Sequence, residues 1–115
     1  MKEIELSKGL VMLLTTESNL NNAQKLSDYL LKKKYAACIN FIEIKSSFWW
    51  NGVIEKSVDE VQVIIKTTEK KLKLILPVIK KIHSYDNPEI ISIPIQVSRQ
   101  YKEWANYSLG IKDSP

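Results

Sequence analysis

The dipeptide Asn51-Gly52 lies between two long runs rich in β-branched and aromatic residues, which together occupy residues 35–68. Asparagine and glycine tolerate the two positive φ angles of a type I′ turn, so the pair predicts a β-hairpin. An arm of about fifteen residues reaches roughly 50 Å. A compact chain of 115 residues has a diameter of only about 35 Å. The hairpin must therefore either bend or project from its own domain.

The tip of this hairpin carries three consecutive aromatic residues, Phe48-Trp49-Trp50. Exposing them to water on a projecting arm is costly, because unpaired strand edges and apolar patches favour association with another chain. The length and the tip together predict self-association.

Composition sets looser limits. Seventeen basic and thirteen acidic residues give a net charge of +4, and the lysine clusters at 32–34 and 70–73 are expected to be a solvated helix end and helix face. The single cysteine, Cys38, excludes an intrachain disulfide and fits a reducing compartment. The first apolar run, residues 10–14, is too short for an export signal or a membrane span. The expectation is a single cytoplasmic domain without nucleic-acid or membrane partners.

Apolar spacing and capping residues predict the other elements. A continuous apolar run indicates a buried strand, three- and four-residue spacing indicates amphipathic helices, and alternation indicates a half-buried strand. In order, these are a strand at 10–15; a helix capped by Ser18 or Asn19 with a stripe of Leu20, Ala23, Leu26 or Ser27, Leu30 and Leu31; the hairpin; a helix capped by Thr67 or Thr68 with a stripe of Leu72, Ile75, Leu76, Ile79 and Ile82; a strand at 89–97; and a short amphipathic segment at 99–107.

This order predicts an α+β chain of the ferredoxin-like βαββαβ class, with a long central hairpin and a short C-terminal helix. Pro94 supports it, because proline inside a strand belongs at a sheet edge and the last strand of this topology is an edge. The predicted organisation is a flexible N-terminus at 1–8, one domain at 9–108 and a tail at 109–115.

Function must be argued from sites, since this fold class hosts many activities. An RNA-recognition domain would carry aromatic residues on its central strands, but 10–15 and 60–67 contain none. A copper chaperone would need paired cysteines after the first strand, and a phosphate-binding enzyme of this class an arginine there; the only arginine is Arg99. No nucleophile stands out, and we expect no enzyme.

The segment after the second helix, His83-Ser84-Tyr85-Asp86-Asn87-Pro88-Glu89, gathers several donor side chains. His83 with Tyr85, Asp86 or Glu89 offers ligand types that suit Cu(II) or Zn(II). The same residues also suit a capped turn, because histidine is stabilised at a helix carboxyl end and Asp and Asn favour turns.

Cys38 is a second candidate ligand, although a single cysteine in a strand is also commonly a small buried residue. The topology places Cys38 and His83 about a strand length apart in one chain. The two residues can then share a metal only across a subunit boundary.

Five motifs in order resemble the CutA divalent-cation-tolerance family, over residues 10–107: Ala36-Ala37-Cys38-Ile39-Asn40, Phe48-Trp49-Trp50-Asn51-Gly52, Ile65-Lys66-Thr67-Thr68, the segment from His83 to Ile90, and Tyr101-Lys102-Glu103-Trp104. The resemblance implies a homotrimer built through long hairpins and sheet edges, similar to the PII nitrogen regulators. It also implies a cytoplasmic protein of copper and divalent-ion tolerance. Some members bind Cu(II), and vertebrate members are linked to acetylcholinesterase anchoring.

The chain departs from the family pattern in four places. Ser84 replaces a usual proline, Asp86 a usual glutamate and Phe48 a usual tyrosine, and the stretch from 52 to 66 is about one residue longer, which indicates a bulge. Ser84 predicts a looser segment that would hold ligands less rigidly.

These observations lead to a homotrimeric metal-tolerance protein that binds Cu(II) or another divalent cation weakly and has no organic cofactor. The expected ligands are His83 first, then Cys38 or a carboxylate, Asp86 or Glu89, from a neighbouring subunit. The alternative is a PII-like signalling or scaffold trimer, which would hold a small metabolite or a protein partner in an intersubunit cleft. That cleft is predicted to contain Trp50, Lys66, Tyr85 and Glu89.

Overall fold

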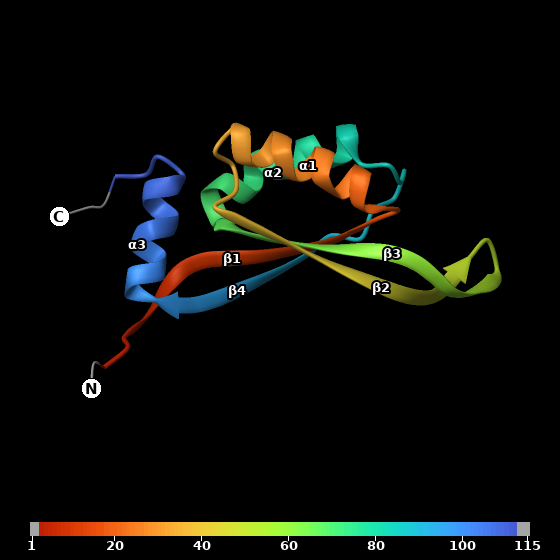
Figure 1. The fold of residues 1–115 in the computed structure, drawn as a ribbon, viewed down its shortest axis with the longest axis horizontal. Helices are drawn as coiled ribbons and strands as arrows, with labels where there is room; N and C mark the ends of the chain where they lie inside the picture. The colour runs from red at the N-terminus through yellow and green to blue at the C-terminus, as the bar shows by residue number, and fades with distance from the viewer. Residues whose placement is uncertain (1–2, 113–115) are drawn as a thin grey trace.

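The structure, a computed structural model, describes residues 3–112 and contains a four-stranded sheet and three helices (Figure 1). The α+β class and the predicted order of elements are confirmed. In chain order the elements are β1 (Leu6–Glu17), α1 (Leu20–Lys32), β2 (Cys38–Trp50), β3 (Val53–Thr68), α2 (Glu69–Ile82), β4 (Ile91–Ser98) and α3 (Arg99–Ser108).

The strands lie in the order β2-β3-β1-β4, and each adjacent pair is antiparallel. The apolar strand β1 is internal, as its unbroken run predicted. Strand β4 is an edge, so the position expected for Pro94 is also confirmed. At an edge, a missing backbone N–H disturbs the ladder least.

The sheet begins earlier than the sequence indicated. Leu6 pairs with Ser98, and the backbone N–H of Arg99 donates to the carbonyl of Glu5 at 2.9 Å. Residues 6–8, expected in a flexible terminus, therefore belong to β1, while residues 1–2 lie outside the described part. These residues pair through backbone groups, which side-chain periodicity does not reveal.

The predicted C-terminal tail also differs at its start. Leu109 is buried, and its backbone N–H donates to the carbonyl of Ala105 to close α3. Residues 113–115 lie outside the described part.

Helices α1 and α2 both cover one face of the sheet (Figure 1). Each has one of the predicted caps, Asn19 accepting from the N–H of Asn22 at 2.8 Å and Thr68 from that of Lys71 at 3.2 Å. No helix of the described residues is long and apolar enough to cross a membrane. The core between helices and sheet contains Leu13, Ala23, Leu26, Leu30, Ala36, Val61, Val63, Ile65, Ile75 and Ile79.

The buried stripes are narrower than predicted. On α2, Ile75 and Ile79 are buried, whereas Leu76 and Ile82 are 37% and 41% exposed. On α1, Leu20 and Leu31 are likewise exposed. Each helix rests on a single sheet in one chain, so apolar residues at the margins of its stripe remain in contact with solvent.

The hairpin of β2 and β3 projects beyond the helices, as its length predicted (Figure 1). The longest dimension of the chain is 53 Å, against 32 and 21 Å for the others. Asn51 and Gly52 have φ angles of 50° and 76°, which are the two positive values of the expected turn. At the tip, Trp49 is 70% exposed.

The predicted bulge lies in β3. Ser46 pairs with Val58 and Phe48 with Glu55, so two residues of β3 oppose the single residue Ser47. Ser57 takes a φ of 52°, and its N–H donates to the hydroxyl of Ser47 at 3.1 Å. The extra residue increases the local bend of the arm.

The face of the sheet opposite α1 and α2 carries many apolar residues and is largely open in a single chain. Because side chains alternate along a strand, the residues between the core positions of β1 and β3 point to this face. Ile42, Ile91 and Ile93 are 48%, 42% and 38% exposed. Among the described elements, α3 lies at one end of this sheet and leaves the rest of the face bare (Figure 1). We call this surface the open face.

Candidate functional site

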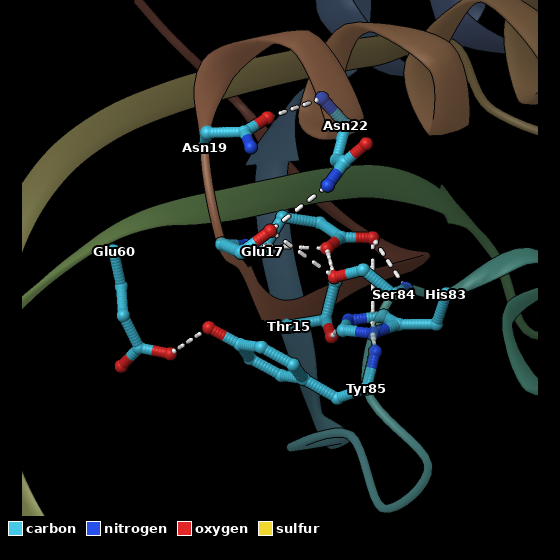
Figure 2. Close-up of polar contacts among 9 residues, drawn as sticks. Thr15, Glu17, Asn19, Asn22, Glu60, His83, Ser84 and Tyr85 are labelled. Atoms are coloured by element: carbon cyan, nitrogen blue, oxygen red, sulfur yellow. Dashed lines mark hydrogen bonds and ion pairs between the residues drawn. The ribbon is translucent and has the colours of Figure 1, made fainter.

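The segment from His83 to Ile90 leaves α2 and crosses the carboxyl end of β1 (Figure 2). His83 ends the helix in an extended conformation, and its backbone N–H donates to the carbonyl of Ile79 at 2.9 Å. Extended backbone at this point directs the next residues away from the helix and toward the end of the sheet. The candidate donor residues are therefore held against β1.

The imidazole of His83 is enclosed, with a side-chain exposure of 0%. Its Nδ1 accepts the backbone N–H of Tyr85 at 2.9 Å, and its Nε2 lies 3.1 Å from the hydroxyl of Thr15. An atom that accepts an N–H hydrogen bond carries no hydrogen, so the ring is the tautomer protonated on Nε2, which donates to Thr15. Both ring nitrogens are thus engaged within the chain.

Glu17, the last residue of β1, is the second buried member of the site. It is 1% exposed and accepts hydrogen bonds from the N–H of Ser18 at 3.2 Å, the N–H of Ser84 at 3.3 Å and the hydroxyl of Ser84. One oxygen lies 3.7 Å from Nδ1 of His83. An ion pair there would need a hydrogen on Nδ1, which the Tyr85 N–H donor excludes, so the three donors are what compensate the buried carboxylate.

Ser84 fixes the segment rather than loosening it. Both its N–H and its hydroxyl donate to Glu17, and a proline, the usual family residue, has neither donor. The hydroxyl also lies 3.3 Å from that of Ser18, which in turn accepts from the amide of Asn22 at 2.9 Å (Figure 2). The expectation of a looser segment is therefore replaced by one held through hydrogen bonds to a buried carboxylate.

Tyr85 reaches around the end of the sheet to Glu60 of β3, and its hydroxyl donates to that carboxylate at 2.7 Å (Figure 2). The pKa of Tyr85 is raised above its ordinary value, chiefly by burial and next by the Glu60 carboxylate. Both effects disfavour the phenolate. Glu60 precedes the core residue Val61, so its side chain points to the open face. The hydrogen bond from Tyr85 therefore links the segment after α2 to the open face.

We expect Tyr85 to ionise at a higher pH than an ordinary tyrosine, because its pKa is raised. A raised pKa in the folded chain adds stability that is fully present below the unfolded pKa of about 10 and is lost as pH rises through the folded value. In a spectroscopic titration, Tyr85→Phe should remove one late-ionising phenol. Loss of an early phenol in Tyr85→Phe would contradict the Glu60 contact.

The other predicted ligands lie apart from His83 in one chain. Cys38 pairs with Lys66, which follows the core residue Ile65 in β3. Because side chains alternate between the two faces, those of Lys66 and Cys38 both point to the open face. There the thiol lies beside Tyr101 of α3, whose pKa is raised by burial and then by this neighbour. Asp86 and Glu89 are exposed on the segment itself. Through Lys66, Cys38 lies level with Met12, three residues along β1 from the Thr15 that His83 contacts. The two side chains lie on opposite faces of the sheet, because Cys38 points to the open face and Thr15 to the core face.

A three-ligand metal site is not assembled within the described chain. No group of three or more His, Cys, Asp or Glu side chains between residues 3 and 112 is close enough to hold an ion. His83 would also have to give up a hydrogen bond before it could coordinate. A closed metal centre therefore does not fit the geometry of one chain, and exposed carboxylates or donors from different chains are the remaining options.

The four predicted cleft residues are also divided. Lys66 points to the open face and donates to the amide oxygen of Asn40 at 3.0 Å. Tyr85 and Glu89 lie on the segment after α2, whereas Trp50 is at the hairpin tip, roughly 40 Å along β2 from the partner of Lys66. Trp50 can meet the others only when it comes from another chain.

Three residues of the site were not singled out from the sequence: Thr15, Glu17 and Glu60. A signal existed for Glu17, since a carboxylate that directly follows a buried apolar strand must find donors or remain at the surface. The donors come from Ser84, 67 positions away, and sequence spacing does not reveal them.

Comparison with known proteins decides the family. The family model described as CutA1 divalent ion tolerance protein matches residues 11–108. The chain belongs to this CutA1 family. The divalent-cation tolerance protein CutA of Archaeoglobus fulgidus is 39% identical over 90 residues, covering 77% of this chain and 87% of that protein. That of Thermotoga maritima is 33% identical over 101 residues, covering 87% and 99%.

Solved CutA structures share the fold. CutA from Synechococcus elongatus superposes with a TM-score of 0.85 at 32% identity, covering 91% of this chain and 96% of that one. The Archaeoglobus fulgidus protein, described as a periplasmic divalent cation tolerance protein, superposes with a TM-score of 0.83. A rice relative is described as chloroplastic. These two relatives are thus described as lying in different compartments.

Proposed function

We propose that this CutA1 family member acts in divalent-cation tolerance as a homotrimer with ferredoxin-like subunits, and that it binds Cu(II) weakly. The observation that carries the assembly is the open face. Ile42 on one edge strand and Ile91 and Ile93 on the other lie on the same face of the sheet, most of which the described elements leave uncovered. Burial of such a surface against another copy is favourable by about 25 cal/mol for each Å² of apolar area.

The projecting hairpin supports the same assembly. Its tip exposes Trp49 at 70% and Trp50 at 56%, and aromatic residues of this size stabilise interfaces most when they are buried. The family resemblance implies three copies. In a closed trimer, each hairpin can lie against a neighbouring subunit, and no strand edge is left free.

Weak copper binding follows from the donors that remain accessible. Asp86 and Glu89 are exposed carboxylates, and Cys38 is a half-buried thiol on the open face. Thiol and carboxylate donors from adjacent subunits can meet at such an interface, but exposed and flexible ligands give only modest affinity. A cytoplasmic location stays a prediction.

The second candidate function is a PII-like signalling or scaffold trimer. Lys66 favours it, because this ammonium group points to the open face beside Asn40 and opposite Cys38. A cleft that brought Trp50 of another chain to Lys66 would offer an aromatic surface and a cation to a small anion.

Native mass spectrometry during a Cu(II) titration distinguishes these functions. We expect a trimer that takes up copper in the micromolar range, with uptake reduced at least several-fold by Asp86→Asn together with Glu89→Gln. Asp28→Asn with Glu69→Gln is the matched control, since it makes the same charge change at exposed positions elsewhere. Equal uptake by both double variants would remove these carboxylates as ligands. A trimer that takes up no copper would favour the signalling or scaffold function.

A further inference from the structure

We infer that His83 is a positioning residue that holds the segment 83–90 against the end of β1, and that it is not a ligand for a divalent cation. The inference goes beyond the proposed function, which names a cation but does not depend on this side chain. It rests on which atoms the two ring nitrogens contact and on the enclosure of the ring.

The first step is the occupancy of the two nitrogens. A metal needs a ring nitrogen with a free lone pair. In His83 the Nδ1 lone pair accepts the N–H of Tyr85 at 2.9 Å, and Nε2 carries the hydrogen that it donates to Thr15 at 3.1 Å. Coordination would therefore break one of these two hydrogen bonds and leave a part-buried polar group without a partner, at a cost of about 1–3 kcal/mol.

The second step is access. The side chain of His83 has no exposed surface, and Thr15 and Glu17 beside it are 0% and 1% exposed. The carboxylate nearest to the ring, that of Glu17, already accepts three hydrogen bonds from Ser18 and Ser84. A cation would have to reach an enclosed ring and displace these donors as well.

The third step is what the ring does in place of coordination. By accepting the N–H of Tyr85, the imidazole fixes the backbone of the residue whose hydroxyl meets Glu60 at 2.7 Å. By donating to Thr15, it attaches the same segment to β1. His83 thus determines where the Tyr85 ring crosses from the core side of the sheet to the open face, and the two rings lie 5.3 Å apart.

The chain offers a clean test because His83 is its only histidine. Electron spin-echo measurements on the Cu(II)-loaded full-length protein detect imidazole nitrogen bound to copper. We expect no imidazole coupling, whether copper binds at other donors or not at all. An imidazole coupling in the unmodified protein that disappears in His83→Asn would overturn the inference. Uptake of copper without that coupling leaves the proposed function intact, so failures of the two ideas are distinguishable.

A pair of variants tests the positioning role. An asparagine oxygen can replace Nδ1 as acceptor, and a glutamine amide can replace the Nε2 donor. We expect His83→Asn to retain protection of the Tyr85 backbone amide against hydrogen exchange, and His83→Gln to accelerate its exchange about tenfold or more. Both variants lose the imidazole, so a general loss of stability would affect them alike. Equal exchange of the Tyr85 amide in the two variants would contradict the positioning role of His83.

Discussion

Ile93→Asp should abolish assembly of the chain at concentrations where the unmodified protein is fully associated. Ile93 pairs with Met12 on the open face and is 38% exposed in one chain. If a neighbouring copy covers it, the new carboxylate is buried without a partner, at a cost of several kcal/mol per subunit. About 4 kcal/mol weakens association roughly a thousandfold. Sedimentation or light scattering across a dilution series measures this shift.

The matched control is Leu76→Asp. Leu76 is 37% exposed and lies on α2, on the other side of the sheet. The two substitutions make the same kind of chemical change at nearly the same exposure, so they differ in which surface they alter. Assembly retained by both variants, or lost in both, would contradict assembly through the open face.

Glu17→Ala should lower the free energy of unfolding by about 3 kcal/mol, because three part-buried donors lose their buried acceptor. Those donors are the N–H of Ser18 and both the N–H and the hydroxyl of Ser84. Chemical denaturation at a fixed protein concentration gives the value, since stability of an oligomer depends on concentration. Removing this carboxylate also detaches the segment after α2 from β1.

The comparison for this substitution is Glu43→Ala, which removes an exposed glutamate of β2. Its effect should be within about 0.5 kcal/mol, as is usual for surface positions. A loss in Glu17→Ala no larger than in Glu43→Ala would show that the hydrogen bonds at the end of β1 do not stabilise the chain.

Local features of the fold were predictable because their causes are local. Asn51 and Gly52 adopt the turn that their own backbone preferences dictate, and Pro94 lies at the edge where its missing N–H does least harm. Asn19 and Thr68 cap their helices with side chains three residues from the N–H groups they accept. In each case the physical cause lies within a few residues of its effect.

The site was less accessible to such reasoning because its partners are far apart along the chain. Glu17 is satisfied by Ser84, His83 contacts Thr15 across 68 positions, and Tyr85 reaches Glu60. The sequence identified His83 and Tyr85 as chemically notable, but the buried acceptors become visible only when β1, β3 and the segment after α2 are brought together. Ser84 shows this best, since a residue expected to loosen the segment supplies two of its hydrogen bonds.

Exposed apolar residues follow a related rule. Leu76 belongs to a predicted helical stripe, and Ile91 and Ile93 belong to the strand predicted at 89–97, yet all three remain exposed in a single chain. Apolar periodicity reports which face avoids water, and it does not say whether the cover comes from the same chain or from a second copy. The long hairpin was the stronger sign of a second copy, because its length exceeds the size of its own domain.

Native mass spectrometry of the unmodified protein, without added metal, tests the central claim most directly. The open face and the projecting hairpin predict a single dominant species of three chains, which persists on dilution to low micromolar concentration. A species of one chain under the same conditions would contradict the account, because Ile93, Trp49 and Trp50 would then remain exposed without a partner.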